Sequence, residues 1–289
     1  WNPAGITKTG YFDLDISLAM GGENTEDFEN LYNLYQAVEN EDYDAAEKLA
    51  GEINAPLGLA PTFTIGISFF KRIAISGGFQ ADFSVTKFQE DTDESGKYIE
   101  IEDIETALVP VYLSFARKVT ENLTLGLNAK YIQAGRHHSH FKIYEEDIQK
   151  IYDETAQSDP TFSFDIGALY QRKGSAFTLG VMVENLLEPE LEFSEELGSM
   201  TLSRKINIGV AYQPSSLLTL AADVHNLTDD PTFHFGGEMD LKLIKLRAGL
   251  NDGDLSLGAG LNLLLFNIQV AYYEKDKRDP YVSLVLFHM

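Results

Sequence analysis

Apolar and polar residues alternate along many stretches of this chain. In residues 123–131 every second residue is apolar, and the residues between them are polar or glycine. Side chains of a β-strand point alternately to its two faces, so the pattern predicts a strand with one apolar and one polar face. It recurs at residues 63–67, 73–77, 177–181, 218–223 and 255–259. Repetition on this scale favours a closed barrel over a single soluble sheet.

The alternation predicts fourteen strands, the first at residues 12–20 and the last at 281–289. Helical outer loops are expected at 21–56, where apolar residues recur at helical spacing, and at 143–158. Long and short connections alternate, as in outer-membrane barrels with long outer loops and short periplasmic turns. The long ones are 21–56, 89–97, 143–158, 188–198, 226–232, 251–254 and 275–279. The predicted fold is all-β: residues 1–289 form one 14-stranded antiparallel transmembrane β-barrel with short helices in the outer loops.

Composition narrows the class of protein further. The chain has 289 residues, a net charge of -23 and no cysteine. The acidic balance argues against a nucleic-acid partner, because no basic stripe is available to meet phosphates. No run of about eighteen apolar residues is present, so no transmembrane helix is predicted. Because Trp1 is not a natural start, we expect that an export signal has been removed.

Strand parity places a set of charged residues on the polar face, which would line the lumen of a barrel. These lumen-lining candidates are Asp13, Asp15, Asp82, Lys130, Asp165, Glu184, Lys205, Asp223, Glu238, Asp240 and Arg247. Paired acids such as Asp13 and Asp15 are found in hydrolases, but we interpret them here as partners of basic residues across the lumen. No Gly-x-Ser-x-Gly motif and no phosphate loop occurs, so we do not expect an enzyme.

A histidine cluster lies in residues 136–140. By parity His138 and His140 share the lumen face, and imidazole suits zinc, copper or nickel. Two ligands do not complete a site, since structural zinc takes four protein ligands and catalytic zinc three. We therefore favour a solvated patch at the outer rim, and we expect no metal and no other cofactor.

Two prolines interrupt the predicted strands. Proline removes a hydrogen bond from the ladder and is confined to edges and bulges. Pro61 and Pro110 are therefore candidates for a break in the wall of the barrel. The alternative is a bulge near a rim, where bulges are common.

Both ends of the chain carry a resemblance to a known family. The chain begins with Asn2-Pro3-Ala4-Gly5 and ends in a strand with Tyr281, Val285 and Phe287 on one face. With the fourteen predicted strands, these features resemble the FadL-like superfamily of outer-membrane barrels.

Within that superfamily the chain looks most similar to the TraF-like group, which is linked to conjugal transfer. The similar features are an acidic helical insert after the first strand, at residues 23–54, and the hairpin at 116–126. Two features differ from fatty-acid transporters and typical barrels. The segment before the first strand is shorter than a plug domain, and the last residue is Met289 where phenylalanine is usual.

The resemblance implies a protein of the bacterial outer membrane that contacts its lipid. Residues 1–9 would form a short plug, with a gate made of Trp1, Asn2, Pro3, Ala4 and Gly5. In fatty-acid transporters an inward kink of the wall opens a lateral exit, which one of the two prolines would mark here. The first hypothesis is passive uptake of small hydrophobic molecules, detergent included, through a gated lumen. The alternative is a barrel without transport that serves a secretion, conjugation or envelope-anchoring system, and the sequence names no protein partner.

Overall fold

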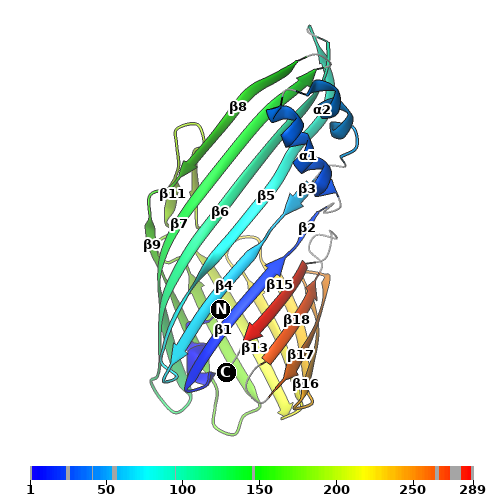
Figure 1. Ribbon diagram of the computed structural model, residues 1–289. Coiled ribbons are helices and arrows are strands. Elements are labelled where there is room, and N and C mark those ends of the chain that lie inside the picture. The colour runs from blue at the N-terminus through cyan, green and yellow to red at the C-terminus, as the bar shows by residue number, and fades with distance from the viewer. Residues whose placement is uncertain are drawn as a thin grey trace.

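The computed structural model describes residues 2–23, 27–40, 42–53, 57–94, 96–144, 147–263, 267–273 and 281–287. In these ranges the chain is all-β, with seventeen strands in one large sheet and two more in a separate hairpin. One 3₁₀-helix and two α-helices complete the fold (Figure 1). None of the helices described is both long enough and apolar enough to cross a membrane.

Most strands of the large sheet run between a lower end with short turns and an upper end with longer connections (Figure 1). They are β1 (Phe12–Met20), β4 (Thr62–Phe69), β5 (Ile73–Asp93), β6 (Gly96–Lys118), β7 (Leu123–Tyr144), β9 (Thr161–Tyr170), β10 (Phe177–Glu184), β13 (Lys205–Ser215), β14 (Leu218–His225), β15 (Thr232–Asp240), β16 (Ile244–Asn251), β17 (Asp254–Asn262), β18 (Asn267–Tyr273) and β19 (Tyr281–Phe287). The remaining elements are η1 (Pro3–Lys8), β2 (Gly22–Glu23), α1 (Phe28–Glu39), α2 (Tyr43–Ala50), β3 (Leu57–Leu59), β8 (Ile148–Gln157), β11 (Glu190–Glu192) and β12 (Ser199–Thr201).

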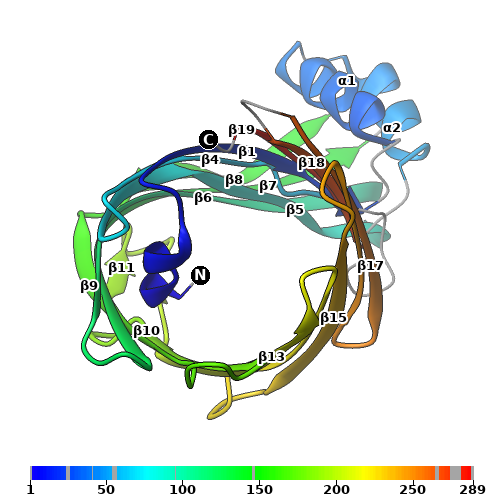
Figure 2. The same cartoon turned by 90° about the horizontal axis from the view of Figure 1, so that it is seen from below.

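The large sheet is antiparallel and curves around a central space. β1 pairs with β4 along one edge and with β19 along the other, so the first and last strands are neighbours. Seen from below, the strands surround the space, which we call the lumen, and η1 lies within it (Figure 2). The sheet has more strands than the fourteen expected because β2, β3 and β8 add short or peripheral pairings.

The two faces of the sheet differ in chemistry, as the alternation predicts. Outward side chains are apolar and solvent-exposed; Leu125 and Leu220, for example, are 42% and 45% exposed. The inward neighbours on the same strands are polar, as at Asn128 and Lys130, which are both buried. Successive side chains of a strand alternate, so the same ladder produces an apolar outside and a polar inside.

β5, β6 and β7 are 21, 23 and 22 residues long and extend above the other strands (Figure 1). The loop expected at 89–97 is wrong for its described residues, because the β5–β6 ladder continues to the pair Asp93 and Gly96. The residues there are polar and acidic, which made them resemble a loop in sequence. Backbone pairing with a neighbouring strand decides the conformation here, and composition does not.

The helical loop expected at 143–158 is also wrong for its described residues. β7 continues to Tyr144, and residues 148–157 form β8, which pairs with β7 from Gly135–Gln157 to Ile143–Ile148. β8 contains Ile148, Ile151 and Tyr152, which favour strands. The exposed edge of β7 offers a ladder of hydrogen bonds, and this tertiary pairing overrides the local helical pattern.

The expected helices after the first strand are present as α1 and α2. They pack on the outward face of the upper extension of the sheet (Figure 1). Their shared core is Leu34, Ala37, Ala46, Ala50, Ile53, Leu57, Val85, Ile99, Ile101 and Ile143. The Tyr35 hydroxyl of α1 donates a 2.6 Å hydrogen bond to Asp103 of β6. Burial raises the pKa of Tyr35, and the neighbouring Asp103 carboxylate raises it further.

Candidate functional site

The N-terminal segment folds back into the lower end of the lumen. Asn2 begins η1: its side-chain oxygen accepts a 3.0 Å hydrogen bond from the Ala4 amide, and Pro3 occupies the first helical position. Both features favour a helix start at this residue. The Asn2 amide also donates to the carbonyls of Ala168 (3.3 Å) and Val181 (3.0 Å), on β9 and β10. Of the predicted gate residues, Asn2, Pro3 and Ala4 thus contact the inner wall, and Gly5 follows them in η1, whereas Trp1 lies outside the described residues.

Two glycines of the wall make room for this segment. Gly126 and Gly167 are paired neighbours on β7 and β9. A Cβ atom at Gly126 would lie 2.3 Å from the Ala4 nitrogen, and one at Gly167 would lie 2.1 Å from the Asn2 side-chain oxygen. Only glycine, which lacks a Cβ atom, permits the Ala4 backbone and the Asn2 side chain to approach the wall so closely. We call this pair the glycine cradle.

One side chain of η1 anchors it further. Ile6 is fully buried and packs with Ala74 and Ala116, on the inner faces of β5 and β6. Thr9, which follows η1, meets Ser68 of β4 through their hydroxyls at 3.1 Å. η1 is therefore held on several strands at once.

A buried polar network lies on the inner wall above the glycine cradle. Lys130 and Asp165 form a 2.6 Å ion pair with side-chain exposures of 5% and 3%. Asn128 donates a 3.0 Å hydrogen bond to Asp165, and Lys130 also donates to Asn185. A buried ion pair requires such additional hydrogen bonds to offset the cost of desolvating its charges.

Asn185 links this polar network to the segment between β10 and β13. Its φ of 51° is left-handed, a region that asparagine tolerates better than most residues. Its backbone amide donates to Asp165 and its side-chain amide to the Ser203 carbonyl, both at 3.0 Å. The segment between Asn185 and Ser203 carries the β11–β12 hairpin.

That hairpin packs against the inner face of the extended wall. Leu191 is fully buried and clusters with Ile132 and Ala134 of β7. Arg136 donates a 3.0 Å hydrogen bond to the Leu197 carbonyl and lies over the Phe193 ring at 5.0 Å. Sequence reasoning treated this segment only as a long loop. The alternation of Leu191 and Phe193 with acidic residues was the available signal.

A cavity of about 490 Å³ lies in the lumen beside the polar network. Of the predicted lumen-lining residues, it brings together Asp13, Asp15, Lys130, Asp165 and Glu184. Thr9, directly after η1, also lines it, so the cavity borders the N-terminal segment.

Other predicted lumen residues lie on the opposite wall, around a second cavity of about 540 Å³ lined by Asp223, Glu238 and Arg247. Arg247 forms a 2.7 Å ion pair with Glu238 and donates to Gln269 at 2.9 Å. Asp240 meets Lys245 at 3.5 Å.

Like Asp240, two further predicted lumen residues stand apart from both cavities. Asp82 lies opposite Thr106 in the β5–β6 ladder, and Lys205 begins β13 opposite Glu184. Both side chains are exposed, and neither lines either cavity.

The two prolines occupy different surroundings. Pro61 lies between β3 and β4, and its carbonyl accepts a 3.0 Å hydrogen bond from Ala81, so the contact with β5 continues there. Pro110 lies inside β6, where pairing with β5 lapses between Gly77–Val111 and Gln80–Leu108. Pro110 and Gly77 also line the first cavity.

The histidine pair lies on the extended part of β7. His138 and His140 contact Glu102 and Glu100 of β6 at 2.8 and 2.7 Å. Over the ranges that the structure describes, no group of three or more His, Cys, Asp or Glu is placed to hold a metal ion.

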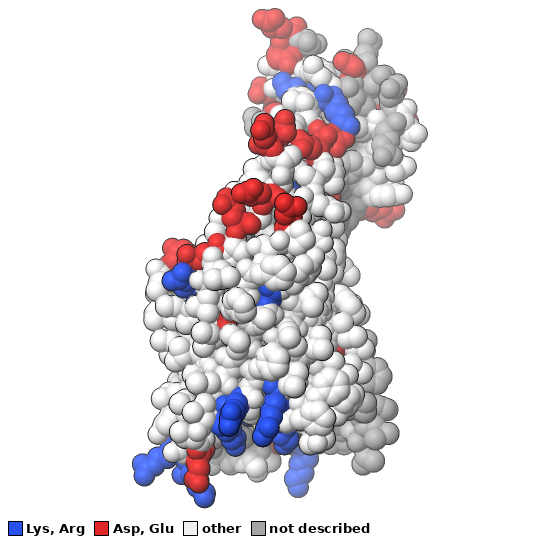
Figure 3. All heavy atoms as spheres, turned by 90° about the vertical axis from the view of Figure 1, so that its left-hand side faces the viewer, with Lys and Arg blue, Asp and Glu red and all other residues white. Residues whose placement is uncertain are grey.

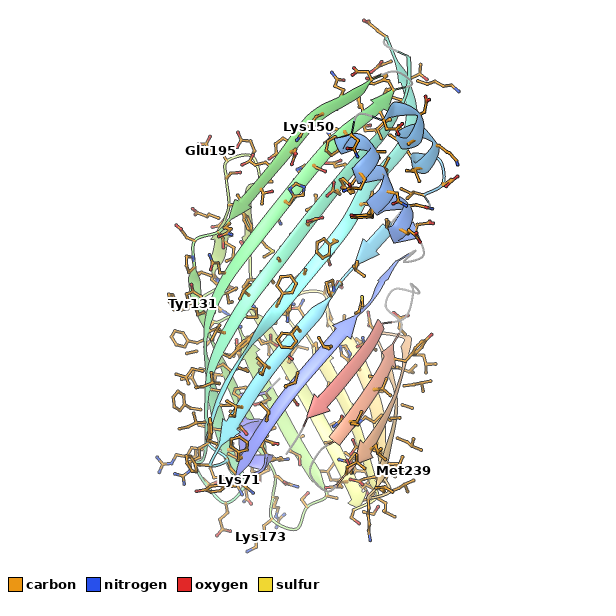
Figure 4. The ribbon with its side chains drawn as sticks, in the orientation of Figure 1. Lys71, Tyr131, Lys150, Lys173, Glu195 and Met239 are labelled. Carbon is orange, nitrogen blue, oxygen red and sulfur yellow. The ribbon has the colours of Figure 1, made fainter. Side chains whose placement is uncertain are left out.

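The two ends of one face of the molecule differ in their predominant charge. Basic side chains gather at the lower end and acidic ones at the upper end of the face in Figure 3. Three neighbouring lower turns supply exposed basic pairs: Lys71 and Arg72, Arg117 and Lys118, and Arg172 and Lys173. Lys71 and Lys173 are visible at this end in Figure 4, and Lys150 and Glu195 at the other.

The fold is similar to that of several solved transporters. The toluene transporter TbuX of Ralstonia pickettii has a TM-score of 0.62 at 13% identity, over 99% of this chain and 91% of that chain. The toluene transporter TodX of Pseudomonas putida gives 0.58 at 9%, over 99% and 92%. A FadL homologue of Pseudomonas aeruginosa gives 0.52 at 11%, over 99% and 91%. Identities this low show the fold alone, and the predicted resemblance to the FadL-like superfamily is confirmed at that level.

Sequence comparison identifies the family. No match occurs among curated protein sequences. Residues 9–225 match the family described as "F plasmid transfer operon, TraF, protein", which is more than half of the 289 residues. The chain therefore belongs to the TraF family, and its all-β fold is the one found in FadL-type transporters.

Proposed function

We propose that this chain is an outer-membrane channel whose sheet closes into a barrel of fourteen membrane-spanning strands. These strands are β1, β4 to β7, β9, β10 and β13 to β19. The pairing of β1 with both β4 and β19 supports closure. The observation that carries the proposal is the apolar outer face, where large side chains such as Leu125, Leu220 and Leu257 stand exposed. In water such a surface would be unfavourable, whereas in a bilayer it is solvated by lipid.

The lower end is the periplasmic end in this proposal. Its turns are short, and both termini of the barrel lie toward that side, as expected for such proteins. Aromatic pairs on the outer surface lie close to these turns, as in Phe12–Phe69 and Phe177–Tyr212. Aromatic side chains favour the membrane interface, so these pairs mark its periplasmic boundary. An export signal removed before insertion belongs to the same proposal.

The channel takes up small hydrophobic molecules passively through a gated lumen. η1 borders the first cavity, because Ala74, which packs against Ile6, and Thr9, which follows η1, both line it; the β11–β12 hairpin packs on the wall above. The fold is shared with proteins described as toluene transporters, which supports a small hydrophobic substrate. The lapse in pairing at Pro110, beside the cavity, supports a lateral route through the wall at that point.

Three measurements test this proposal. Extraction should require detergent, and the folded protein should migrate differently from the boiled protein in a gel. Liposomes that contain the protein should admit a small aromatic compound faster than empty liposomes. A soluble monomer without detergent would refute the membrane location, and unchanged influx would refute the channel.

The structure also favours a second candidate, an assembly barrel without transport. β5 to β8 extend above the other strands and carry α1 and α2 on their outward face. Such an extension offers an acidic surface beyond the membrane, and the family description refers to a plasmid transfer operon. Replacing α1 and α2 by a short linker separates the candidates. A channel would retain influx of the aromatic compound into liposomes. An assembly protein would instead lose its activity in secretion, conjugation or envelope anchoring.

A further inference from the structure

Basic residues at the lower end of the molecule are concentrated in three consecutive turns. We call the three basic pairs there the basic sector: Lys71 and Arg72 between β4 and β5, Arg117 and Lys118 at the end of β6, and Arg172 and Lys173 between β9 and β10. All six residues are exposed, and among the described residues none of them takes part in a salt bridge. The whole chain has a net charge of -23, so this local excess of positive charge runs against its composition.

Hydrogen bonds join the three turns into one surface. The Arg72 carbonyl accepts a 2.7 Å hydrogen bond from the Ala116 amide, which places Arg72 beside Arg117. The side-chain oxygen of Asn122, in the β6–β7 turn, accepts a 3.0 Å hydrogen bond from the Lys173 amide. The basic pairs are therefore neighbours along the lower rim, and their positive potentials add.

The basic sector occupies only part of the rim. The other lower connections, at 216–217, 241–243 and 263–266, contain a single basic residue in sequence, Lys242. A complete ring of basic side chains would serve as a general anchor at the membrane interface. Confinement to consecutive turns instead indicates a binding surface on one side of the barrel.

Exposed aromatic side chains place the basic sector at the level of lipid headgroups. Tyr11 and Phe70 are 69% and 55% exposed, their ring centroids are 5.0 Å apart, and Phe70 directly precedes Lys71. Arg117 pairs with the outward Leu125, so it lies on the outward face as well. Figure 3 shows basic side chains at the lower end of this outer surface, directly below the apolar wall. Basic residues beside a surface that lipid covers favour a lipid headgroup over an acidic protein in solution.

We propose that the basic sector binds the phosphate groups of anionic phospholipids, such as phosphatidylglycerol, in the membrane leaflet that surrounds the lower end. Clusters of about four to eight Lys and Arg residues near a membrane surface attract anionic lipids. Zwitterionic lipids carry no net charge and gain less from the same residues. The inference rests on the proposed membrane location and adds a lipid preference that the channel proposal does not require.

Two phospholipids with the same acyl chains test the proposal: phosphatidylglycerol is anionic, and phosphatidylcholine is zwitterionic. The purified full-length protein in a non-ionic detergent is titrated with each lipid, and native mass spectrometry gives the dissociation constant of the first lipid bound. We expect phosphatidylglycerol to bind about fivefold more tightly than phosphatidylcholine.

Variants assign the preference to the basic sector. Replacing all six residues by glutamine should abolish the preference, and a single pair, such as Arg117→Gln with Lys118→Gln, should reduce it. Replacing the three arginines of the sector by lysine retains the charge and should retain the preference. Lys97→Gln with Lys242→Gln is the matched control, because it removes two exposed lysines outside the sector and should leave the preference unchanged. Gel mobility without boiling reports whether each variant folds, and the variants of single pairs decide the question if the sixfold variant does not fold.

The outcomes separate this inference from the proposed function. Equal affinities for the two lipids, or a preference that survives loss of all six charges, would overturn the inference even if influx into liposomes shows that the channel stands. A lipid preference that depends on the basic sector, without influx of any compound, would support the inference and refute the channel. A polyglutamate peptide tests the other kind of partner. If it binds the sector while the lipids show no preference, the surface fits an acidic protein and the lipid site is refuted.

Discussion

The glycine cradle provides the sharpest test of how the lumen is closed. In Gly126→Ala the new Cβ atom would lie 2.3 Å from the Ala4 nitrogen and 2.5 Å from the Pro3 carbonyl carbon. Both are backbone atoms, so no side-chain rotation relieves the overlap. Ordinary contact begins at 3.4 Å, so the N-terminal segment must move by about 1 Å.

Such a shift would stretch the two hydrogen bonds that Asn2 donates to Ala168 and Val181 beyond their normal range, since they are already 3.3 and 3.0 Å long. Each contributes about 1 kcal/mol, so the docked state should lose about 2 kcal/mol. That free energy corresponds to about a thirtyfold larger undocked fraction.

Thiol labelling measures this fraction directly, because the chain has no cysteine of its own. Ile6→Cys places a reporter at a fully buried position of η1. Adding Gly126→Ala should raise its labelling rate about thirtyfold and should increase conductance in a planar bilayer. Gly236→Ala is the control, because its Cβ would meet only the Ala248 carbonyl, at 3.7 Å. Equal labelling rates with and without Gly126→Ala would refute the docking described here.

Three further predictions concern the outer wall, the helices and the polar network. Leu220→Arg, on the outward face, should reduce the folding free energy in liposomes by about 2–4 kcal/mol if it lies near the bilayer midplane, as measured by urea titration. Thr219→Arg, on the inward face, should cost less, and equal losses would contradict the assignment of the faces. The raised pKa of Tyr35 means that docking of α1 is stabilised below the unfolded pKa of about 10 and weakens as pH rises above it. A spin label on α1 should therefore gain mobility above about pH 10, and Tyr35→Phe should abolish that dependence; an unchanged pH profile in the variant would argue against this role. Lys130→Met leaves Asp165 charged and unpaired and should cost about 3–5 kcal/mol in thermal or urea unfolding. The double variant with Asp165→Leu should recover most of that loss. If stability is not recovered, the loss does not come from breaking the Lys130–Asp165 ion pair.

Local pattern determined much of what was predicted correctly. The alternation of apolar and polar residues fixes which side chains of β7 face outward, because the period of a strand is two. Leu125 is accordingly exposed outside, and Lys130 is buried inside. Helical spacing in the first long connection likewise predicted α1 and α2. These features depend only on residues close in sequence.

The same local reasoning failed where distant backbone decides the conformation. Residues 148–157 form a strand because the edge of β7 offers hydrogen-bonding partners, and no periodicity in the segment itself reveals that edge. The polar ends of β5 and β6 remain strands for the same reason, since their ladder continues well above the apolar outer face.

For the candidate site, the sequence by itself determined which residues face inward, and the tertiary structure decided which of them meet. Strand parity put Lys130 and Asp165 on the same face, but only the β7–β9 register places them 2.6 Å apart. In the sequence, Gly126 and Gly167 are only two small residues on the inward face. Their role follows from the structure, in which residues Asn2 to Ala4 lie against them inside the lumen. Parity is a property of one strand, whereas proximity depends on register and curvature across many strands, which is why only the folded chain defines the cavity.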